Sequence, residues 1–206
     1  MKTPERLRIA VQKSGRLNQG SMDFLVSCGL AFAPNGHSLI LPCQNFDLDV
    51  LYLRDDDNPE YVSRGVADFG IVGQNVLAEK EFKPKILKKF DFGKCRLMIA
   101  APADSVIKTP KDLEGERIAT SYPKLLIDYL KKEKLEAAII PISGSVEITP
   151  DLNLADAICD IVQTGTTLKA HDLVPLFTIL ESQAVLIESP INKQFKEKFL
   201  LKCGIN

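Results

Sequence analysis

The chain has 206 residues, of which 45% are hydrophobic and 26% are charged, and its formal net charge is −1 at pH 7. This length and balance fit one sizeable domain or two small lobes and exclude a disordered chain. Because there is no overall basic field, we expect no binding to nucleic acid or to an anionic membrane, and any recognition of phosphate must be local.

The N-terminus and the cysteines bear on where the protein works. The apolar run within "MKTPERLRIAVQKSGRL" is far too short for a signal-peptide core, and no run approaches the about 20 apolar residues of a membrane helix. We therefore expect a cytoplasmic protein. The five cysteines are scattered and form no CxxC pair, which indicates buried free thiols and neither a disulfide framework nor a zinc site.

The first half of the chain reads as alternating strands and helices. Residues 7–11 predict a strand, which the turn "QKSGR" connects to a helix that ends at Gly29. Residues 48–53 predict a buried strand, and a short helix follows with Pro59 at its first position and Gly65 at its end. The segments "VADFGIVG" and "QNVLAEKE" predict one more strand and one more helix.

The second half repeats this alternation. We expect strands in "ERIAT", "AAIIPI", residues 156–162 and "SQAVLIES", and helices in "SYPKLLIDYLKKEKL", after the Thr-Gly-Thr-Thr cluster and in "INKQFKEKFLLKCG". Such alternation predicts parallel sheets. The similar strand-to-helix segments "VADFGIVGQNVL" and "LADAICDIVQTGTTL" indicate two lobes of like construction, and we expect a ligand cleft between them.

The strand-to-helix turn in "DIVQTGTTL" is the first candidate site. Three hydroxyls, a glycine and a helix N-terminus suit a phosphate oxygen, although threonine and glycine are also favoured as ordinary helix caps. Its members are Thr164, Gly165, Thr166, Thr167 and Leu168.

Two acidic residues stand near that turn in the sequence. Asp160 lies before the end of the strand, and Glu147 lies in the preceding short helix. Carboxylates beside a phosphate site repel the phosphate unless they accept hydrogen bonds from sugar hydroxyls or help to hold Mg²⁺. The alternatives are a helix-dipole partner for Glu147 and an ordinary strand-end acid for Asp160.

Three further turns carry candidate residues. Lys13 and Arg16 flank a glycine after the first strand and suit a polyphosphate. Arg54 ends another strand beside three aspartates, which are more often a solvated cap cluster than a metal site. Gly73, Gln74 and Asn75, in "GIVGQNV", could read a neutral base edge.

Together these stretches resemble the ATP phosphoribosyltransferase family. The resemblance rests on the segments "RLRIAVQKSGRL", "LRDDDNPEYVSRGVADFGIVGQNVL", "FDFGKCRL", "RIATSYPKLL", "SGSVEITP" and "LADAICDIVQTGTTL", and it runs from about residue 7 to about residue 186. One position departs from the family signature, because Asn153 stands where a glycine is expected. Asparagine tolerates a left-handed backbone, so we expect the turn to survive.

The resemblance implies a fold and a reaction. The fold is α/β with two doubly wound lobes like those of type II periplasmic binding proteins, one lobe from residues 1–93 and 181–206 and the other from residues 94–180. The reaction joins N1 of the adenine of ATP to C1 of phosphoribosyl pyrophosphate and releases pyrophosphate, which is the first step of histidine biosynthesis. Mg²⁺, carried mainly by the substrate phosphates, is the implied cofactor.

The resemblance also implies roles for the candidate residues. The turn at residues 164–168 would hold the ribose 5-phosphate, and Glu147 and Asp160 would contact ribose hydroxyls or Mg²⁺. Lys13, Arg16 and Arg54 would face pyrophosphate or the phosphates of ATP. Gly73 and Asn75 would contact the nucleotide.

The family has a short form and a long form, and the form that this chain resembles bears on its expected protein partners. The chain length resembles the short form, which implies a homodimer and a hetero-oligomer with a regulatory subunit related to histidyl-tRNA synthetase. The segments "QKSGRL" and "RDDDNP" look closer to the long form, so a truncated long form remains an alternative. In either case we expect this chain itself to lack a histidine site.

Two rival functions stay open on the sequence. One is a solute-binding module without catalysis, because the architecture is shared and a fold does not fix a function. The other is a different nucleotide-binding transferase, against which the lack of GxGxxG after the first strand counts.

Overall fold

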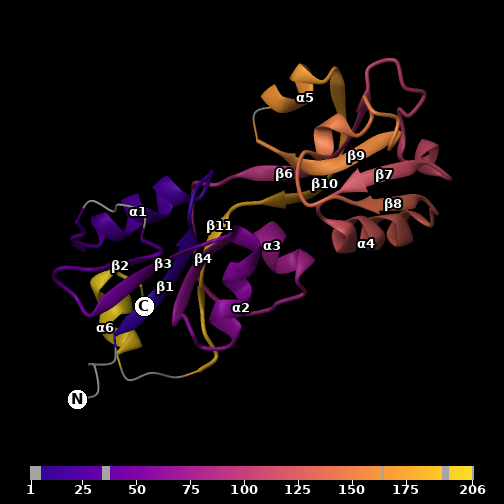
Figure 1. The fold of residues 1–206 in the computed structure, drawn as a ribbon. Coiled ribbons are helices and arrows are strands. Elements are labelled where there is room, and N and C mark those ends of the chain that lie inside the picture. Colours follow the sequence, from indigo (N-terminus) through magenta and orange to yellow (C-terminus); the bar gives the residue numbers. More distant parts are fainter. Residues whose placement is uncertain (1–5, 34–37, 164, 192–194, 206) are drawn as a thin grey trace. The chain divides into compact units, whose positions relative to one another are not determined.

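The computed structural model describes residues 6–33, 38–163, 165–191 and 195–205 (Figure 1). The chain forms two compact units: unit 1 contains Met1–Gly93 and Gln183–Asn206, and unit 2 contains Lys94–Ser182. Each unit has its own sheet and its own hydrophobic clusters, so the α/β fold with two lobes is confirmed. The chain returns from unit 2 to unit 1 after residue 182, whereas the return was expected after residue 180. The difference arises because β10 (Leu173–Ser182) pairs within unit 2 to its end.

Unit 1 is built on a six-stranded sheet in the order β2-β3-β1-β4-β11-β5. The central strand β1 runs parallel to β3 and β4, while β2, β11 and β5 run antiparallel to their neighbours. The carboxyl ends of β3, β1 and β4 therefore lie side by side. The strands are β1 (Leu7–Gln12), β2 (Ile40–Pro42), β3 (Leu48–Leu53), β4 (Phe69–Gly73), β5 (Lys85–Lys89) and β11 (Ala184–Glu188).

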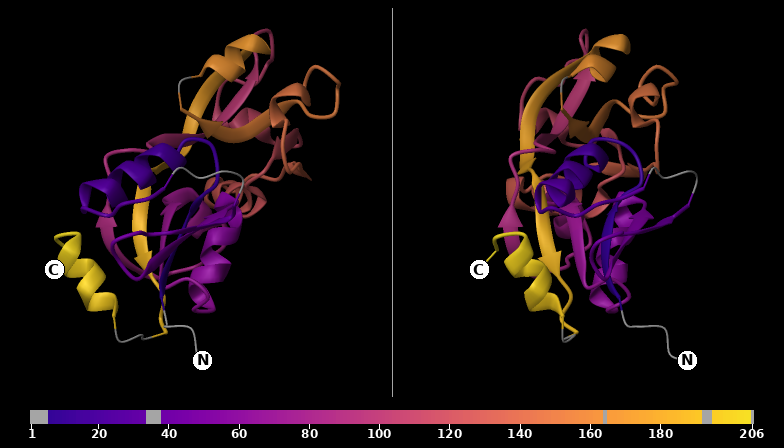
Figure 2. Two further views of the ribbon diagram at one scale, coloured as in Figure 1. Left: turned by 60° about the vertical axis from the view of Figure 1, so that its left-hand side comes forward. Right: turned by 90° about the vertical axis from the view of Figure 1, so that its left-hand side faces the viewer.

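Helices cover both faces of this sheet because its strands alternate their buried side chains between two clusters. Leu25 of α1 (Asn18–Ser27) and Phe199 of α6 (Lys196–Lys202) pack on one face, where Figure 2 shows both helices. Val62 of α2 (Asn58–Ser63) and Val76 of α3 (Gln74–Glu79) pack on the other. A short 3-10 helix, η1 (Asp55–Asp57), precedes α2.

Unit 2 is built on a five-stranded sheet in the order β10-β6-β9-β7-β8. Strand β7 runs parallel to β8 and β9, whereas β6 is antiparallel to β9 and β10. The carboxyl ends of β9, β7 and β8 lie side by side as a result. The strands besides β10 are β6 (Cys95–Pro102), β7 (Arg117–Thr120), β8 (Ala138–Pro141) and β9 (Ala157–Val162).

The two faces of the second sheet are covered unequally. Leu126 and Leu130 of α4 (Pro123–Glu133) are buried on one face. Val146 of η3 (Val146–Ile148) and Leu168 of α5 (Thr166–Ala170) are buried on the other. The 3-10 helix η2 (Pro110–Leu113) lies between β6 and β7 in the chain.

The prediction of parallel sheets is correct only for the three central strands β3-β1-β4 of unit 1 and for the three strands β9-β7-β8 at one side of the sheet in unit 2. Strands β2, β5, β6 and β10 were not predicted, and antiparallel pairs make both sheets mixed. A run of buried apolar residues reveals that a strand exists but carries no information about its direction.

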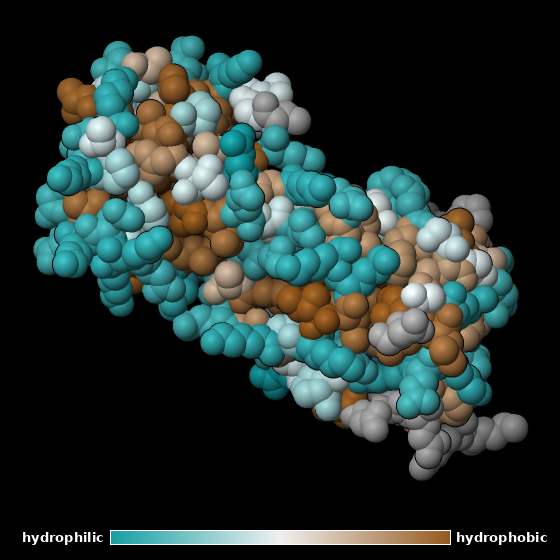
Figure 3. Space-filling view, turned by 180° about the vertical axis from the view of Figure 1, so that it is seen from behind, coloured by the Kyte–Doolittle hydropathy of each residue, from teal (hydrophilic) through white to brown (hydrophobic). Residues whose placement is uncertain are grey.

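The molecular surface carries both hydrophilic and hydrophobic residues. Figure 3 shows hydrophilic side chains over much of one face, with hydrophobic residues between them, and Val106 and Leu201 are among the exposed apolar residues. Across the part of the chain that the structure describes, no helix combines the length and the apolar character needed to cross a bilayer.

Candidate functional site

In unit 1 the residues after β1, β3 and β4 form the first cluster of candidates. Lys13 follows β1 and Arg54 follows β3, and both are exposed. Neither side chain makes a hydrogen bond or ion pair with a residue that the structure describes. Because the three strand ends adjoin, these cations and the end of β4 belong to one edge of the sheet.

The turn after β1 is fixed by its own polar side chains. Gln12 Oε1 accepts a hydrogen bond from the backbone N–H of Leu17 at 3.0 Å, and Asn18 Nδ2 donates to the carbonyl oxygens of Gln12 (2.7 Å) and Lys13 (3.0 Å). Gly15 has φ +95°, which favours glycine. The backbone that presents Lys13 is therefore ordered before any ligand arrives.

Arg16 links the three strand ends. Its Nη1 donates to the carbonyl oxygen of Gly93 at 2.8 Å, and its Nη2 donates to Asn75 Oδ1 at 3.1 Å. The same Nη2 lies 3.7 Å from Asp55 Oδ2, and both of these charged side chains are about 15% exposed. A planar guanidinium held at two edges has a defined orientation, which suits bidentate binding of a phosphate.

Asp55 is the residue that the sequence did not single out. Burial raises the pKa of its carboxyl to about 6, and Asp56 adds to the rise, while Arg16 and the backbone N–H of Gly73 oppose it. Its Oδ1 is buried and accepts no hydrogen bond from the described residues. The interpretation of the three aspartates as a solvated cap cluster fits the exposed Asp56 and Asp57 but is wrong for Asp55.

Gly73 leaves the space in which Arg16 and Asn75 meet. A Cβ at position 73 would lie 3.0 Å from Arg16 Nη2 and far inside the contact distance of Asn75 Oδ1. Its backbone, with φ −72° and ψ 140°, is open to any residue, so space alone requires the glycine. Asn75 is fully buried, and its Oδ1 accepts the hydrogen bond that orients Arg16. The predicted contact of Asn75 with a nucleobase stays a prediction.

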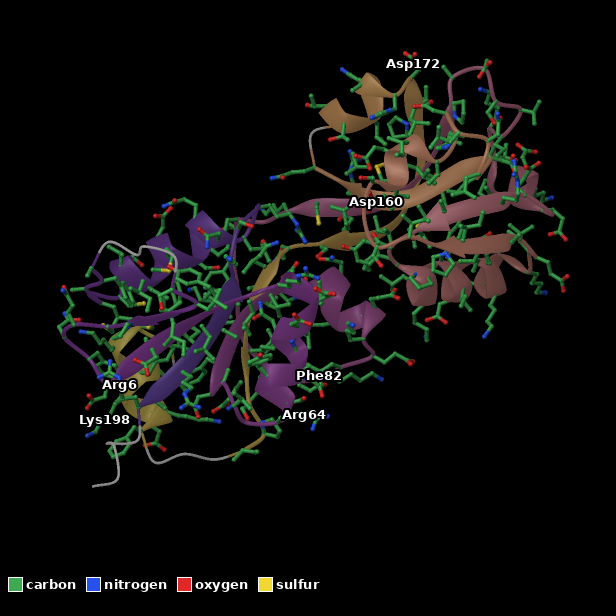
Figure 4. The ribbon with its side chains drawn as sticks, viewed as in Figure 1. Arg6, Arg64, Phe82, Asp160, Asp172 and Lys198 are labelled. Carbon is green, nitrogen blue, oxygen red and sulfur yellow. The ribbon has the colours of Figure 1, made fainter. Side chains whose placement is uncertain are left out.

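In unit 2 the strand β9 carries Asp160 on the face that η3 and α5 cover. Ile158 and Val162, two residues to either side, belong to the same buried cluster as Val146 and Leu168. Ser121, directly after β7, donates to Asp160 Oδ1 at 3.4 Å. Figure 4 labels Asp160 on β9.

Glu147 belongs to the same site. Burial raises the pKa of the Asp160 carboxyl first, and the nearby charge of Glu147 raises it further, against the backbone N–H of Ile161 and the Ser121 hydroxyl. The two predicted acids are thus close enough to interact. Oxygen ligands from one or two carboxylates, completed by substrate phosphates, are a common protein site for Mg²⁺, so this pair fits that ion.

In the part of the chain that the structure describes, no larger metal site competes with that pair. Among the described residues, no group of three or more His, Cys, Asp or Glu side chains could hold a metal ion. A metal at the acid pair would therefore need the substrate or water for its remaining ligands.

The predicted phosphate turn stands at the carboxyl end of β9. Gly165 is left-handed with φ +77° at the cap position of α5, and Thr166 and Thr167 are exposed while Leu168 is buried. A Cβ on Gly165 would meet no atom within 4 Å, which leaves room beside the backbone. Thr164 lies outside the described residues.

Asn153 has a left-handed backbone conformation. Its φ is +57°, which confirms the left-handed turn expected where the family has glycine. Its carbonyl oxygen accepts a hydrogen bond from Arg117 Nη1 at 2.8 Å, and Arg117 also pairs with Asp156 at 2.6 Å. The turn at the entrance to β9 is therefore held from both ends.

A protein-family model matches most of the chain. The model of a family described as ATP phosphoribosyltransferase matches residues 54–203. An ATP phosphoribosyltransferase from Cytophaga hutchinsonii is 47% identical over 184 residues, and one from Maricaulis maris is 46% identical over 188. The alignments cover 89% and 88% of this chain but only 64% of each relative, so the chain spans less than two thirds of the length of the curated relatives it matches.

Solved structures agree with the fold. The ATP phosphoribosyl transferase (HisG:HisZ) complex from Thermotoga maritima contains a chain with 30% identity and a TM-score of 0.80, and the match covers 96% of both chains. The alkanesulfonate-binding protein SsuA from Xanthomonas axonopodis pv. citri matches 98% of this chain and 71% of its own, with a TM-score of 0.59 and 16% identity. The second match shows the shared architecture alone.

Proposed function

Because the chain belongs to the ATP phosphoribosyltransferase family, we propose that it transfers the phosphoribosyl group of phosphoribosyl pyrophosphate to N1 of the adenine of ATP. In this reaction the N1 lone pair forms the new bond to C1 of the ribose, the bond from C1 to the pyrophosphate oxygen breaks, and configuration at C1 inverts. The products are N1-(5-phosphoribosyl)-ATP and pyrophosphate. The proposal makes the chain a cytoplasmic enzyme of histidine biosynthesis.

The observation that carries this proposal is the pairing of two acids with a phosphate turn in unit 2. Glu147 and Asp160 interact, and the turn at Gly165 leaves the same strand that carries Asp160. Acids tolerate a neighbouring phosphate when hydroxyls or a metal ion lie between them, and a ribose 5-phosphate offers both hydroxyls and phosphate. Residues 164–168 would bind the phosphate, and the two acids would bind the ribose hydroxyls or Mg²⁺.

The cations of unit 1 suit the other charged groups. Negative charge grows on the departing pyrophosphate as the C1 bond breaks, and fixed cations stabilise that charge. Arg16 is held in one orientation, whereas Lys13 and Arg54 are exposed and extend from adjoining strand ends. We assign these three residues to the phosphates of ATP or to pyrophosphate. Gly73 and Asn75 would contribute to nucleotide binding by positioning Arg16.

Mg²⁺, when bound, would neutralise phosphate charge and help to polarise the leaving group. The protein's own part is to align N1 with C1 and to exclude other geometries, and such alignment can supply a large share of the rate enhancement. No nucleophilic side chain is needed for this displacement.

A double substitution tests the assignment of the phosphate turn. Thr164→Val with Thr167→Val removes two hydroxyls and keeps β-branched shape, so the KM for phosphoribosyl pyrophosphate should rise at least tenfold while the KM for ATP changes less than threefold. Thr178→Val, on an exposed position of β10, is the matched control and should change neither value. An effect confined to the KM for ATP would refute the placement.

The assembly is part of the proposal. The Thermotoga maritima protein is a HisG:HisZ complex, and this chain matches 96% of its similar chain. We therefore propose a homodimer that joins a regulatory subunit of the HisZ kind. Light scattering of the chain alone and with such a subunit would test it, and an unchanged mass on mixing would contradict the hetero-oligomer.

A further inference from the structure

A buried carboxylate beside Arg16 has no function in the reaction proposed above. Asp55 lies 3.7 Å from Arg16, a loose distance for an ion pair, and its Oδ1 is buried without a hydrogen-bond donor among the described residues. Asn75 and Gly93 already fix the guanidinium. Asp55 is therefore poorly explained as a structural partner of Arg16.

We propose that Arg16 and Asp55 form a proton-coupled anion site: a phosphate group of the substrate replaces the Asp55 carboxylate as the counter-ion of Arg16, and Asp55 takes up one proton from solvent as the phosphate binds. This inference rests on the proposed function for its ligand class, phosphates, and it adds a change of charge within the site. Asp55 is then a residue that tunes Arg16 and does not touch the reacting atoms.

The surroundings of Asp55 make this exchange favourable. Arg16 comes from the turn after β1, Asp56 from the same 3-10 helix, and the neutral Gly73 N–H from the end of β4; of these, Arg16 and Gly73 favour the ionised carboxyl. A phosphate bound to Arg16 would cancel the main attraction and add a repulsion. Burial already disfavours the charged form, so the carboxyl would protonate.

The effect of a bound anion on the protonation of Asp55 follows from the charge of the anion and its distance. A unit negative charge about 6 Å from the carboxylate, at an effective dielectric constant near 20, favours the protonated form roughly a hundredfold. The pKa of Asp55 is about 6 without a ligand, so only about a tenth of the molecules carry this proton at pH 7. Binding of the anion should therefore draw in more than about half a proton per chain.

Linkage gives a second expectation. The wild-type protein must protonate Asp55 before it binds the anion well, whereas Asp55→Asn presents a neutral side chain at every pH. The ratio of wild-type to variant dissociation constants should therefore be about 1 at pH 5 and about 10 at pH 7.

The test uses the full chain and inorganic pyrophosphate as the probe. Calorimetric titrations at pH 7 in two buffers of different ionisation enthalpy measure the protons taken up on binding. The titration of pyrophosphate itself is common to both proteins and cancels in the difference between wild type and Asp55→Asn. Asp57→Asn, an exposed neighbour at the cap of α2, is the control and should behave as wild type.

The outcomes separate this inference from the transferase proposal. A difference of more than half a proton, with the tenfold ratio of affinities at pH 7, supports the site even if no phosphoribosyl transfer is found. Equal proton uptake by wild type and Asp55→Asn, or no binding of pyrophosphate by wild type, overturns it even if transfer occurs. Should Asp55→Asn fail to fold, the carboxyl ¹³C shift of Asp55 in the wild-type protein must move toward the protonated value on addition of pyrophosphate.

Discussion

Replacing Gly73 with alanine should disable Arg16 without changing its charge. The added methyl carbon would stand 3.0 Å from Arg16 Nη2 and would overlap Asn75 Oδ1, and Asn75 is fully buried. Overpacking of this kind costs about 1–3 kcal/mol, and a lost hydrogen bond to a charged group costs about 1.5–3 kcal/mol. We expect a loss of about 2–4 kcal/mol in the stability of unit 1.

The same change should weaken anion binding, because the guanidinium loses one of the contacts that orient it. Thermal unfolding should shift down by about 5–10 °C, and the affinity for pyrophosphate should fall at least tenfold by calorimetry. Gly144→Ala is the control, since a Cβ there meets nothing within 4 Å and the backbone is not left-handed, and it should unfold as wild type. If Gly73→Ala unfolds and binds pyrophosphate like the control, the crowding argument for the Arg16 cluster is wrong.

Three other predictions follow from the residues described. The pKa of Asp55 is about 6 in the folded protein and near 3.8 in the unfolded chain, so the folded protein holds this proton more tightly. The contribution of Asp55 to stability is therefore most favourable below pH 4 and is lost as pH rises through 6. Asp55→Asn should therefore stabilise the protein by about 3 kcal/mol at pH 7 and by almost nothing at pH 4. Chemical denaturation measures this difference, and an equal difference in the free energy of unfolding between variant and wild type at the two pH values would contradict the prediction. Asp160→Asn should raise the KM for phosphoribosyl pyrophosphate at least tenfold in steady-state kinetics, because a carboxylate accepts from two hydroxyls or binds Mg²⁺ and an amide does neither as well; an unchanged KM would remove Asp160 from the sugar site. Asn153→Gly should keep the left-handed turn and change the free energy of unfolding by less than about 1 kcal/mol, whereas Asn153→Val should cost more than that, and equal melting temperatures for the two variants would show that the turn is not required.

The sequence was informative where one short segment contains both the strand and the residues that follow it. "DIVQTGTTL" predicted a buried strand, a glycine turn and a helix start, and the structure has β9, a left-handed Gly165 and α5 there. The placement of Lys13, Arg16 and Arg54 at strand ends followed in the same way. Their common edge depends on strand order, which appears once β1 is seen between β3 and β4.

The sequence was uninformative where the environment of one residue depends on distant parts of the chain. Asp55, Asp56 and Asp57 are identical in type, yet only Asp55 is turned toward Arg16 and Gly73, which come from other strand ends. Nothing in the run "DDD" distinguishes its members. Similarly, β6 and β10 pair over sequence separations that no local pattern encodes, so their antiparallel pairing was not predicted.

The most direct test of the central claim is a transfer assay on the chain with ATP, phosphoribosyl pyrophosphate, Mg²⁺ and pyrophosphatase. The near-ultraviolet absorbance of N1-substituted adenine should rise only when both substrates are present, and mass spectrometry should find ATP carrying one phosphoribosyl group. Tight binding of either substrate without this product, both for the chain alone and with a regulatory subunit of the HisZ kind, would contradict the account and favour a binding protein.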